Sequence, residues 1–282
     1  MNFTDQRVVV TGAASGIGAE TARVLAADGA HVISVDRNPA SGAHIAQHIA
    51  CDLTDRASID AAVAAIDGPI DALCNVAGVP GNLPSQTVFA VNFLGLRHLT
   101  EALADQITDG GAIVNVASIA GNKWQTNLTE VKLLLATPSF EDGVAWTNDN
   151  SMTGTRSYNF SKEAVIVWTM AASQRWWSRG IRLNSVSPGA IETPILVDFR
   201  ESMGDEAIDW AINAIGRCRT SVRHRAGCCV PRQPSHAVDQ WHQPHRRRRP
   251  DGRRHRRRVR LTLCAEPTRR RSHRILPVGH FR

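Results

Sequence analysis

Short runs of β-branched residues alternate with helical patterns in the first part of the chain. Residues 8–10 (VVV) and 32–34 (VIS) are continuous apolar runs, typical of strands that are buried on both faces. The stretch between them, residues 19–29, has apolar residues at helical spacing. This alternation predicts an α/β fold in which helices cover both faces of a parallel sheet.

The same rhythm continues toward residue 216. The sequence predicts a helix over residues 88–107, a strand over 111–118, a helix over 157–178 and a strand over 181–189. We therefore expect residues 1–216 to form a single Rossmann-like, doubly wound domain. Two segments interrupt the pattern: an insertion at residues 122–152, and residues 195–215, a predicted helical lid over a pocket. The expected apolar face of this lid consists of Met203, Ile208, Trp210, Ile212 and Ile215.

Charge divides the chain at residue 216. Residues 1–216 carry 13 Lys and Arg against 23 Asp and Glu, a net charge of −10. Residues 217–282 carry 20 Arg, no Lys and 3 acidic residues, a net charge of +17, and the two parts account for the total of +7. Residues 217–282 are therefore an Arg-rich tail that needs its own explanation.

Cysteine usage indicates the compartment. Cys51 and Cys74 lie in the domain, without the even framework that secreted proteins use for disulfides. The remaining cysteines lie in the tail: Cys218, Cys228, Cys229 and Cys264. The N-terminus lacks the apolar region of a signal peptide, and no stretch is apolar enough to span a bilayer. We therefore expect a cytoplasmic protein with no membrane partner.

A glycine-rich sequence, TGAASGIG, occupies residues 11–18 between the first predicted strand and a helix. Gly12 permits a tight turn, and Gly16 and Gly18 permit close backbone approach to a pyrophosphate at the helix N-terminus. A plain strand-to-helix loop has a similar pattern. We expect a dinucleotide to contact this loop through Gly12, Ser15, Ile17 and Gly18.

Asp36 ends the second predicted strand, 24 residues after Gly12. A carboxylate there can accept hydrogen bonds from ribose hydroxyls and repels a 2′-phosphate, which favours NAD over NADP. Arg37 leaves NADP open, because an arginine can bind that phosphate. Asp52 and Leu53 are candidates to flank the adenine, although a helix N-cap and a core leucine would give the same pattern.

Further motifs follow in a recognisable order. NVAG at residues 75–78 ends a strand with small residues, so we expect Asn75, Ala77 and Gly78 to line the cofactor. Asn92, Ser118 within NVASIAG, YNFSK at residues 158–162 and SPGAIETP at residues 187–194 come after it. With TGAASGIG, these motifs resemble the short-chain dehydrogenase/reductase family, whose members are NAD(P)-dependent oxidoreductases.

The chemistry of such an enzyme requires a base for the alcohol proton. Tyr158 is a poor base at its ordinary pKa of about 10, and Lys162, one helical turn later, can favour the phenolate and hold the nicotinamide ribose. Ser118 can steady charge on the substrate oxygen. The resemblance implies that Asn92 keeps a helix open around a proton-relaying water. It also implies that the nicotinamide amide is fixed by Pro188, Gly189, Ile191 and Thr193.

Ser118 and Tyr158 are 40 residues apart, because the insertion lies between them. With LCNVAGVPG and KEAVIVW, the insertion resembles a branch that contains bacterial coniferyl-alcohol dehydrogenases and 3α-hydroxysteroid dehydrogenase/carbonyl reductases. This implies oxidation of an aromatic allylic alcohol such as coniferyl alcohol, with the steroid or carbonyl substrates as the alternative. The large insertion residues either line a pocket or a subunit interface, or only pack: Trp124, Leu133, Leu134, Leu135, Phe140 and Trp146.

The tail from residue 217 has no apolar periodicity and lacks the helix and final V-D-G-G strand that the resemblance implies. An arginine arm for nucleic acid is one hypothesis, but the tail has no lysines and no interleaved aromatic residues. The C-x-x-C spacing of a zinc site is absent, so we expect no metal.

We favour a frameshift as the origin of the tail, because shifted codons for residues 239–249 are compatible with I-N-G-I-N-L-T-V-D-G-G. We expect the in-frame protein to be a homo-oligomer, a dimer or tetramer, and the printed tail to be disordered.

Overall fold

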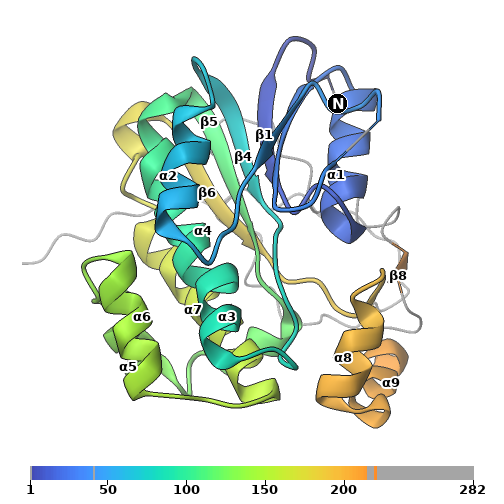
Figure 1. The fold of residues 1–282 in the computed structure, drawn as a ribbon, viewed down its shortest axis with the longest axis vertical. Coiled ribbons are helices and arrows are strands. Elements are labelled where there is room, and N and C mark those ends of the chain that lie inside the picture. Colours follow the sequence, from blue (N-terminus) through green and yellow to red (C-terminus); the bar gives the residue numbers. More distant parts are fainter. Residues whose placement is uncertain (1, 41, 215–218, 221–282) are drawn as a thin grey trace, which may run out of the picture. The chain divides into compact units, whose positions relative to one another are not determined.

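Six parallel strands form the central sheet of the computed structural model, which describes residues 2–40, 42–214 and 219–220 (Figure 1). They are β1 (Arg7–Thr11), β2 (His31–Asp36), β3 (Gln47–Ala50), β4 (Ile70–Asn75), β5 (Ile107–Val116) and β6 (Arg182–Val186). Their order, β3-β2-β1-β4-β5-β6, places β1 beside β4. This order confirms the predicted Rossmann-like, doubly wound sheet.

Helices connect the strands. The α-helices are α1 (Gly16–Ala27), α2 (Arg56–Ala64), α3 (Ser85–Phe89), α4 (Gly95–Leu103), α5 (Leu128–Leu135), α6 (Phe140–Asp149), α7 (Thr155–Ala172), α8 (Leu196–Met203) and α9 (Asp205–Ala214). A π-helical turn, η1 (Ala90–Leu94), and the 3-10 turns η2 (Ala104–Gln106), η3 (Ile119–Gly121) and η4 (Trp177–Arg179) complete the helical structure. The predicted helix over residues 88–107 is therefore a succession of α3, η1, α4 and η2.

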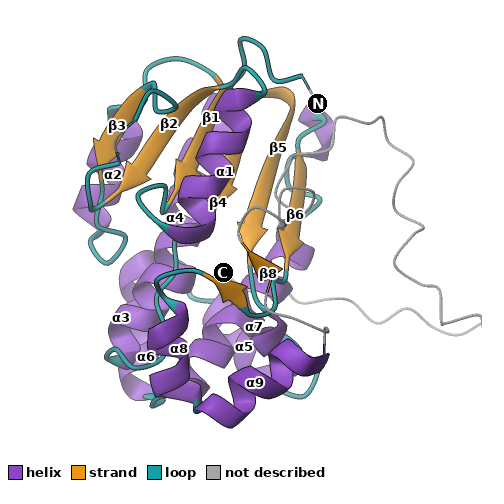
Figure 2. Ribbon diagram, turned by 90° about the vertical axis from the view of Figure 1, so that its right-hand side faces the viewer, coloured by secondary structure: helices purple, strands orange, loops and turns teal. Residues whose placement is uncertain are grey.

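The hydrophobic core lies on both faces of the sheet. Side chains alternate along β1, so Val9 belongs to one cluster while Val8 and Val10 belong to the other. The larger cluster packs under α2, α4 and α7, and the smaller one packs under α1 (Figure 2). Because β1 and β4 are parallel neighbours, the turns after them, which contain glycine and small residues, meet at the carboxyl end of the sheet. Ligands of doubly wound folds bind at that end.

The insertion forms α5 and α6, and its aromatic side chains pack against the core. Trp146 stacks on Phe160 of α7, with ring centroids 5.8 Å apart and an interplanar angle of 15°. Phe140 is buried, and Trp124 packs against the larger core cluster. Leu133 is exposed to 57%. The packing interpretation therefore accounts for these three aromatic residues, whereas Leu133 faces solvent.

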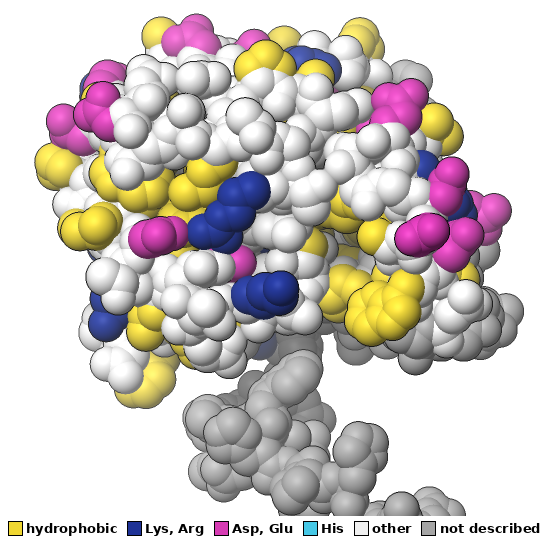
Figure 3. Space-filling view, turned by 90° about the horizontal axis from the view of Figure 1, so that it is seen from below, with side chains coloured by type: hydrophobic (Ala, Val, Ile, Leu, Met, Phe, Trp, Pro, Cys, Tyr) yellow, Lys and Arg dark blue, Asp and Glu magenta, His cyan; other side chains and the backbone are white. Residues whose placement is uncertain are grey.

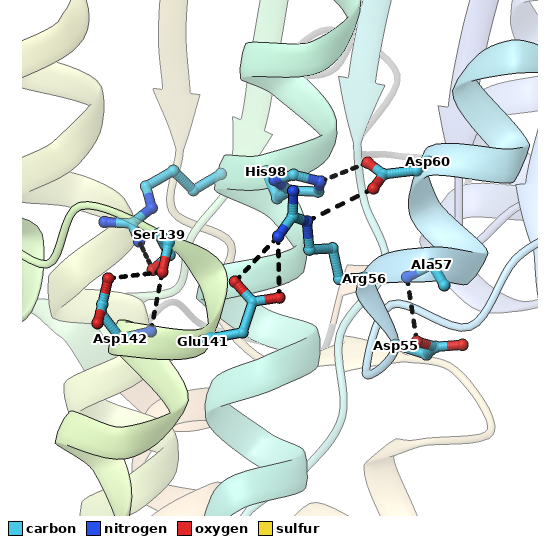
Figure 4. A network of polar contacts seen from close by, with 9 residues as sticks. Asp55, Arg56, Ala57, Asp60, His98, Ser139, Glu141 and Asp142 are labelled. Atoms are coloured by element: carbon cyan, nitrogen blue, oxygen red, sulfur yellow. Dashed lines mark hydrogen bonds and ion pairs between the residues drawn. The ribbon is translucent and has the colours of Figure 1, made fainter.

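A polar network fastens α6 to the body of the domain (Figure 4). Glu141 of α6 accepts from Arg56 of α2 at 3.1 Å. Asp60 of α2 hydrogen-bonds His98 of α4 at 2.7 Å and lies 3.5 Å from Arg56. These groups are mostly half-exposed, so the network fixes geometry more than it adds stability.

The predicted lid over residues 195–215 forms α8 and α9 up to Ala214. Ile208 is buried, as its place on the predicted apolar face requires. The prediction for Trp210 is wrong, since 69% of this residue is exposed. Trp210 lies two positions after the buried Ile208, about 200° around the helix. Hydrophobic side chains are also visible among charged ones in Figure 3, which views the molecule from below. Ile215 lies outside the described residues.

Most of the Arg-rich tail lies outside the described residues. Arg219 and Thr220 form a short strand, β8, which pairs in parallel with β7 (Ile191–Glu192). The predicted disorder of the tail is therefore wrong for these two residues. For residues 217–218 and 221–282, which lie outside the described residues, it stays a prediction. Within the described part of the chain, no helix combines the length and apolarity needed to cross a membrane.

Candidate active site

Helix α7 and the end of β5 bring the predicted base and its partner together. Tyr158 lies in the first turn of α7, and Ser118 is the second residue after the end of β5. A side-chain hydrogen bond joins the two residues. Burial raises the pKa of Tyr158 to about 12, and the hydrogen bond with Ser118 opposes this rise. Burial of the phenol thus disfavours its ionised form, and Ser118 is the hydroxyl partner that opposes this effect.

Lys162 lies one helical turn after Tyr158 and is buried. Its Nζ donates to the carbonyl oxygen of Val116 at 2.9 Å and lies 5.9 Å from the centroid of the Tyr158 ring. Burial lowers the pKa of Lys162 to about 8. In this arrangement the ammonium binds the Val116 carbonyl, and desolvation dominates the pKa of both Lys162 and Tyr158.

Asn92 lies in the π-helical turn η1 and is fully buried. Its Oδ1 accepts from the Val79 amide at 2.8 Å, and its Nδ2 donates to the Val79 carbonyl at 3.1 Å and to Ser161 Oγ at 3.0 Å. The widened turn agrees with the open helix that the sequence led us to expect. Asn92 thereby ties the turn after β4 to α7. No separate sequence signal points to Val79 or Ser161, because these contacts depend on how the helices pack.

Helix α8 covers the phenol of Tyr158. Phe199 packs edge-on against the Tyr158 ring, with centroids 4.9 Å apart. Thr155 Oγ1 donates to the Ser202 carbonyl at 2.7 Å, which fixes α8 to the start of α7. Tyr158 is consequently only 6% exposed. Phe199 could not be predicted as part of the site, since an isolated aromatic residue in a predicted lid carries no distinctive sequence signal.

The glycine loop after β1 has the shape that close ligand approach requires. Gly12 and Gly16 adopt φ values of 69° and 55°, which favour glycine. A Cβ on Gly12 would lie 2.8 Å from Ala77 Cα, and one on Gly18 would lie 2.0 Å from the Gly12 carbonyl oxygen. Ser15 is the N-cap of α1, so Ile17 and its neighbours lie at the positive end of the helix. The loop fits the pyrophosphate of a dinucleotide.

Asp36 joins this loop to the end of β2. Its Oδ2 accepts from the Ala14 amide at 3.0 Å, and its Oδ1 accepts from the Asn38 amide at 2.9 Å. The carboxylate is therefore held beside the glycine loop, as a ribose-binding acid would be. Arg37 is exposed at the same strand end.

Some predicted cofactor residues have side chains directed elsewhere. The Asn75 side chain is buried and donates to Thr100 Oγ1 at 2.8 Å and Asn115 Oδ1 at 2.9 Å. Strand β4 thus directs this side chain into the core, and the place of Asn75 beside the cofactor, through its backbone, stays a prediction. Leu53 belongs to the hydrophobic core, and Asp52 Oδ1 accepts from the Thr54 amide at 2.8 Å. The core-leucine interpretation therefore holds for Leu53.

The turns after β4 and β6 complete the site. Thr11 Oγ1 accepts from the Ala77 amide at 3.0 Å, and a Cβ on Gly78 would lie 3.4 Å from Lys162 Nζ. Pro188 accepts from the Ile119 amide at 3.0 Å. In the same loop between β6 and β7, Gly189 is half-buried, and Ile191, the first residue of β7, is buried.

Thr193 closes the site on the side of α1. Its side chain lies 3.5 Å from the position of a Cβ on Gly16. A cavity of about 310 Å³ adjoins this contact, lined by Gly16, Ala19, Glu20, Arg23, His44, Glu192, Thr193 and Pro194. The loop after β6 therefore meets the glycine loop across the carboxyl end of the sheet.

Comparison with known proteins agrees with this geometry. The family model described as short chain dehydrogenase matches residues 6–129, and the one described as Enoyl-(Acyl carrier protein) reductase matches residues 144–223. Coniferyl-alcohol dehydrogenase from Pseudomonas sp. (strain HR199 / DSM 7063) is 44% identical over 207 residues, which cover 73% of this chain and 81% of that protein.

Solved structures give the same result. The 3-alpha-hydroxysteroid dehydrogenase from Pseudomonas sp. B-0831, complexed with NADH, has a TM-score of 0.67 and 29% identity. The similarity covers 79% of this chain and 88% of that one. The 3-ketoacyl-(acyl-carrier-protein) reductase from Brucella melitensis, also complexed with NADH, has a TM-score of 0.62 and 25% identity, over 82% and 93% of the two chains. The chain belongs to the short-chain dehydrogenase family of oxidoreductases.

Proposed function

We propose that the protein is an NAD-dependent alcohol dehydrogenase that oxidises an aromatic allylic alcohol to its aldehyde. The observation that carries this proposal is the group of buried Tyr158 and Lys162 with half-buried Ser118, together with a glycine loop of the correct shape. We assign Ser118, Tyr158 and Lys162, together with Asn92, as the catalytic residues. When bound, NAD⁺ supplies the acceptor for the hydride that leaves the alcohol carbon.

Residues of this chain carry out the transfer of the proton from the substrate hydroxyl. Tyr158 takes the proton of the substrate hydroxyl at its phenolic oxygen, for which it must first be ionised. Lys162 supplies a buried positive charge one turn away, and such a charge favours the phenolate more strongly in a low dielectric. Ser118 donates to the substrate oxygen and holds it against Tyr158. Asn92 keeps η1 open and bound to Ser161, next to Lys162.

The preference for NAD rests on Asp36. Its carboxylate, held by the Ala14 and Asn38 amides, can accept from ribose hydroxyls and repels a 2′-phosphate. Arg37 is the opposing feature at the same strand end. The remaining residues that would hold the cofactor are those of the glycine loop, the turn at Ala77–Gly78 and the loop from Pro188 to Thr193.

Two observations favour an aromatic substrate. The relative with 44% identity is a coniferyl-alcohol dehydrogenase, and Phe199 places an aromatic ring directly on Tyr158. The alternative, a 3α-hydroxysteroid dehydrogenase/carbonyl reductase, is supported by the solved structure with a TM-score of 0.67. A panel of coniferyl alcohol, cinnamyl alcohol, a 3α-hydroxysteroid and aliphatic alcohols, monitored by NADH absorbance, distinguishes them.

Tyr158→Phe is the decisive variant in this panel. It should lose several orders of magnitude in kcat while NADH binding stays nearly intact, because only the phenolic oxygen is removed. NADH binding measured by fluorescence titration provides the control. Substantial residual turnover would show that the base lies elsewhere.

A second class of function, nucleic-acid binding through the Arg-rich tail, follows from charge alone. A salt-dependent gel shift that compares the full chain with residues 1–216 tests it, because phosphate contacts weaken steeply with salt. We propose no nucleic-acid partner. We further propose a cytoplasmic homo-oligomer, a dimer or tetramer for the in-frame protein, which light scattering can measure.

A further inference from the structure

A buried carboxylate lies next to the catalytic lysine. Glu163 directly follows Lys162 on α7, and its side chain is only 1% exposed. The proposed reaction gives it no role. A buried carboxylate is costly unless nearby groups satisfy its oxygens, so the partners of Glu163 matter for the structure around it.

The partners of Glu163 come from the insertion and from the start of α7. Asn127 Nδ2 lies 3.0 Å from Oε1 and 2.9 Å from Oε2 of Glu163. Arg156 lies 3.6 Å from Oε2, stacks over the Phe160 ring and binds Glu130 of α5 at 3.1 Å. Burial raises the pKa of Glu163, while Asn127 and Arg156 oppose the rise. The amide of Asn127 is thus the closest donor to this carboxylate among the described residues.

Asn127 ends the segment that begins at Ser118. This segment contacts α7 at three successive places. Ser118 hydrogen-bonds Tyr158 at its start, and a Cβ on Gly121 would lie 2.9 Å from the Lys162 carbonyl carbon in its middle. Asn127 binds Glu163 at its end. Residues 118–127 are therefore attached to α7 along their length, with the Glu163 contact as the distal attachment.

We propose that Glu163 is a positioning residue which, through Asn127, holds residues 118–127 against α7 and so sets Ser118 against Tyr158. This inference rests on the proposed function, in which Ser118 and Tyr158 act together. It gives the insertion a catalytic consequence without placing any of its residues in contact with substrate. Removing the Asn127 amide leaves a buried carboxylate poorly satisfied, which favours release of the segment from α7.

A double-mutant cycle on kcat tests the proposal, with Glu163→Gln and Ser118→Ala made singly and together in the full chain. Glu163→Gln should lower kcat about tenfold, with KM for NAD changed less than about twofold. In the Ser118→Ala background the same change should cost less than about twofold, because the group it positions is already gone. Asn127→Ala should reproduce the effect of Glu163→Gln, and it provides the test if Glu163→Gln does not fold.

Glu130→Gln is the matched control. It removes an exposed carboxylate from the same cluster without touching Asn127, and kcat should be unchanged. An equal loss from Glu163→Gln in both backgrounds, or no loss from either Glu163→Gln or Asn127→Ala, would overturn the positioning role. Full activity of Ser118→Ala would overturn the catalytic assignment itself and the positioning role with it, so the two failures are distinguishable.

Discussion

Burial changes the two ionisable residues of the site in opposite directions. It raises the pKa of Tyr158 to about 12 and lowers the pKa of Lys162 to about 8. Both shifts favour the neutral forms, although the proposed reaction uses an ionised tyrosine beside a charged lysine. Ionising Tyr158 and keeping Lys162 charged in this buried site therefore costs free energy, which substrate and cofactor must offset when they bind.

Lys162→Met should stabilise the protein without cofactor. Burying the ammonium lowers its pKa from 10.5 to about 8, which corresponds to about 3 kcal/mol of destabilisation while both the folded and unfolded states are protonated. Below pH 8 the variant should therefore be more stable, by on the order of 1–3 kcal/mol. As pH rises from 8 to 10.5 the folded state loses its proton first, so the wild-type penalty and the advantage of the variant should disappear.

Urea unfolding of both proteins at pH 7, 8, 9 and 10 measures this difference. Tyr158 weakens both proteins above pH 10, because its folded pKa lies above its unfolded value, so the comparison ends there. A stability difference that stays constant from pH 7 to pH 10 would show that Lys162 is not buried with its charge.

Asp36→Ala should narrow the preference for NAD over NADP by about tenfold or more, since hydrogen bonds to a charged group contribute roughly 1.5–3 kcal/mol. It also removes the acceptor for the Ala14 amide, so KM for NAD should rise. The measurement is kcat/KM with each cofactor. Equal efficiency with NADP in the unaltered enzyme would contradict the role of Asp36, and Arg37→Ala then identifies the competing group.

At the scale of elements, α8 determines access to the reactive phenol. The helix is attached to α7 by the Thr155–Ser202 hydrogen bond and by the packing of Phe199 on Tyr158. The insertion helices instead pack on the core and on α7. We therefore expect α8 to select the substrate, and α5 and α6 to act on the site indirectly.

Phe199→Ala should lower kcat/KM for cinnamyl alcohol about tenfold, because an aromatic partner contributes roughly 0.5–1.5 kcal/mol beyond the area it buries. Aliphatic allylic alcohols should change less than about threefold. Val197→Ala is the control, since Val197 lies on the same helix and is exposed to 64%. Equal losses for aromatic and aliphatic substrates would assign Phe199 to general closure of the site.

At the scale of the molecule, the described residues cover the two faces of the sheet unequally. Helices α2, α4 and α7 pack on one face, whereas α1 alone packs on the other. Strand β6 pairs only with β5 in the described part of the sheet. In a doubly wound fold, helices cover both faces of the sheet and its edges are protected. We therefore expect a further helix on the face of α1 and a further strand beside β6. Shifted codons for residues 223–238 are compatible with such a helix, and those for residues 239–249 with such a strand.

We predict that a single-base change between codons 217 and 223 restores a frame that ends in V-D-G-G. The family match continues to residue 223, seven residues beyond the charge boundary at 216, which sets the upper limit of this interval. Sequencing the gene is the direct test, and the restored protein should be more soluble and more active than the printed chain. Confirmation of the printed frame together with a stable, active full-length enzyme would make the Arg-rich tail a genuine feature.

Local sequence patterns were enough to predict the sheet, the glycine loop and the order of the candidate catalytic residues. These depend on local rules: apolar periodicity, the backbone freedom of Gly12 and Gly16, and the one-turn spacing of Tyr158 and Lys162. The packing of Phe199 on Tyr158 and the hydrogen bond between Asn127 and Glu163 became visible only in the folded chain. Contacts of this kind depend on how distant helices are rotated and packed against each other, which no local period encodes.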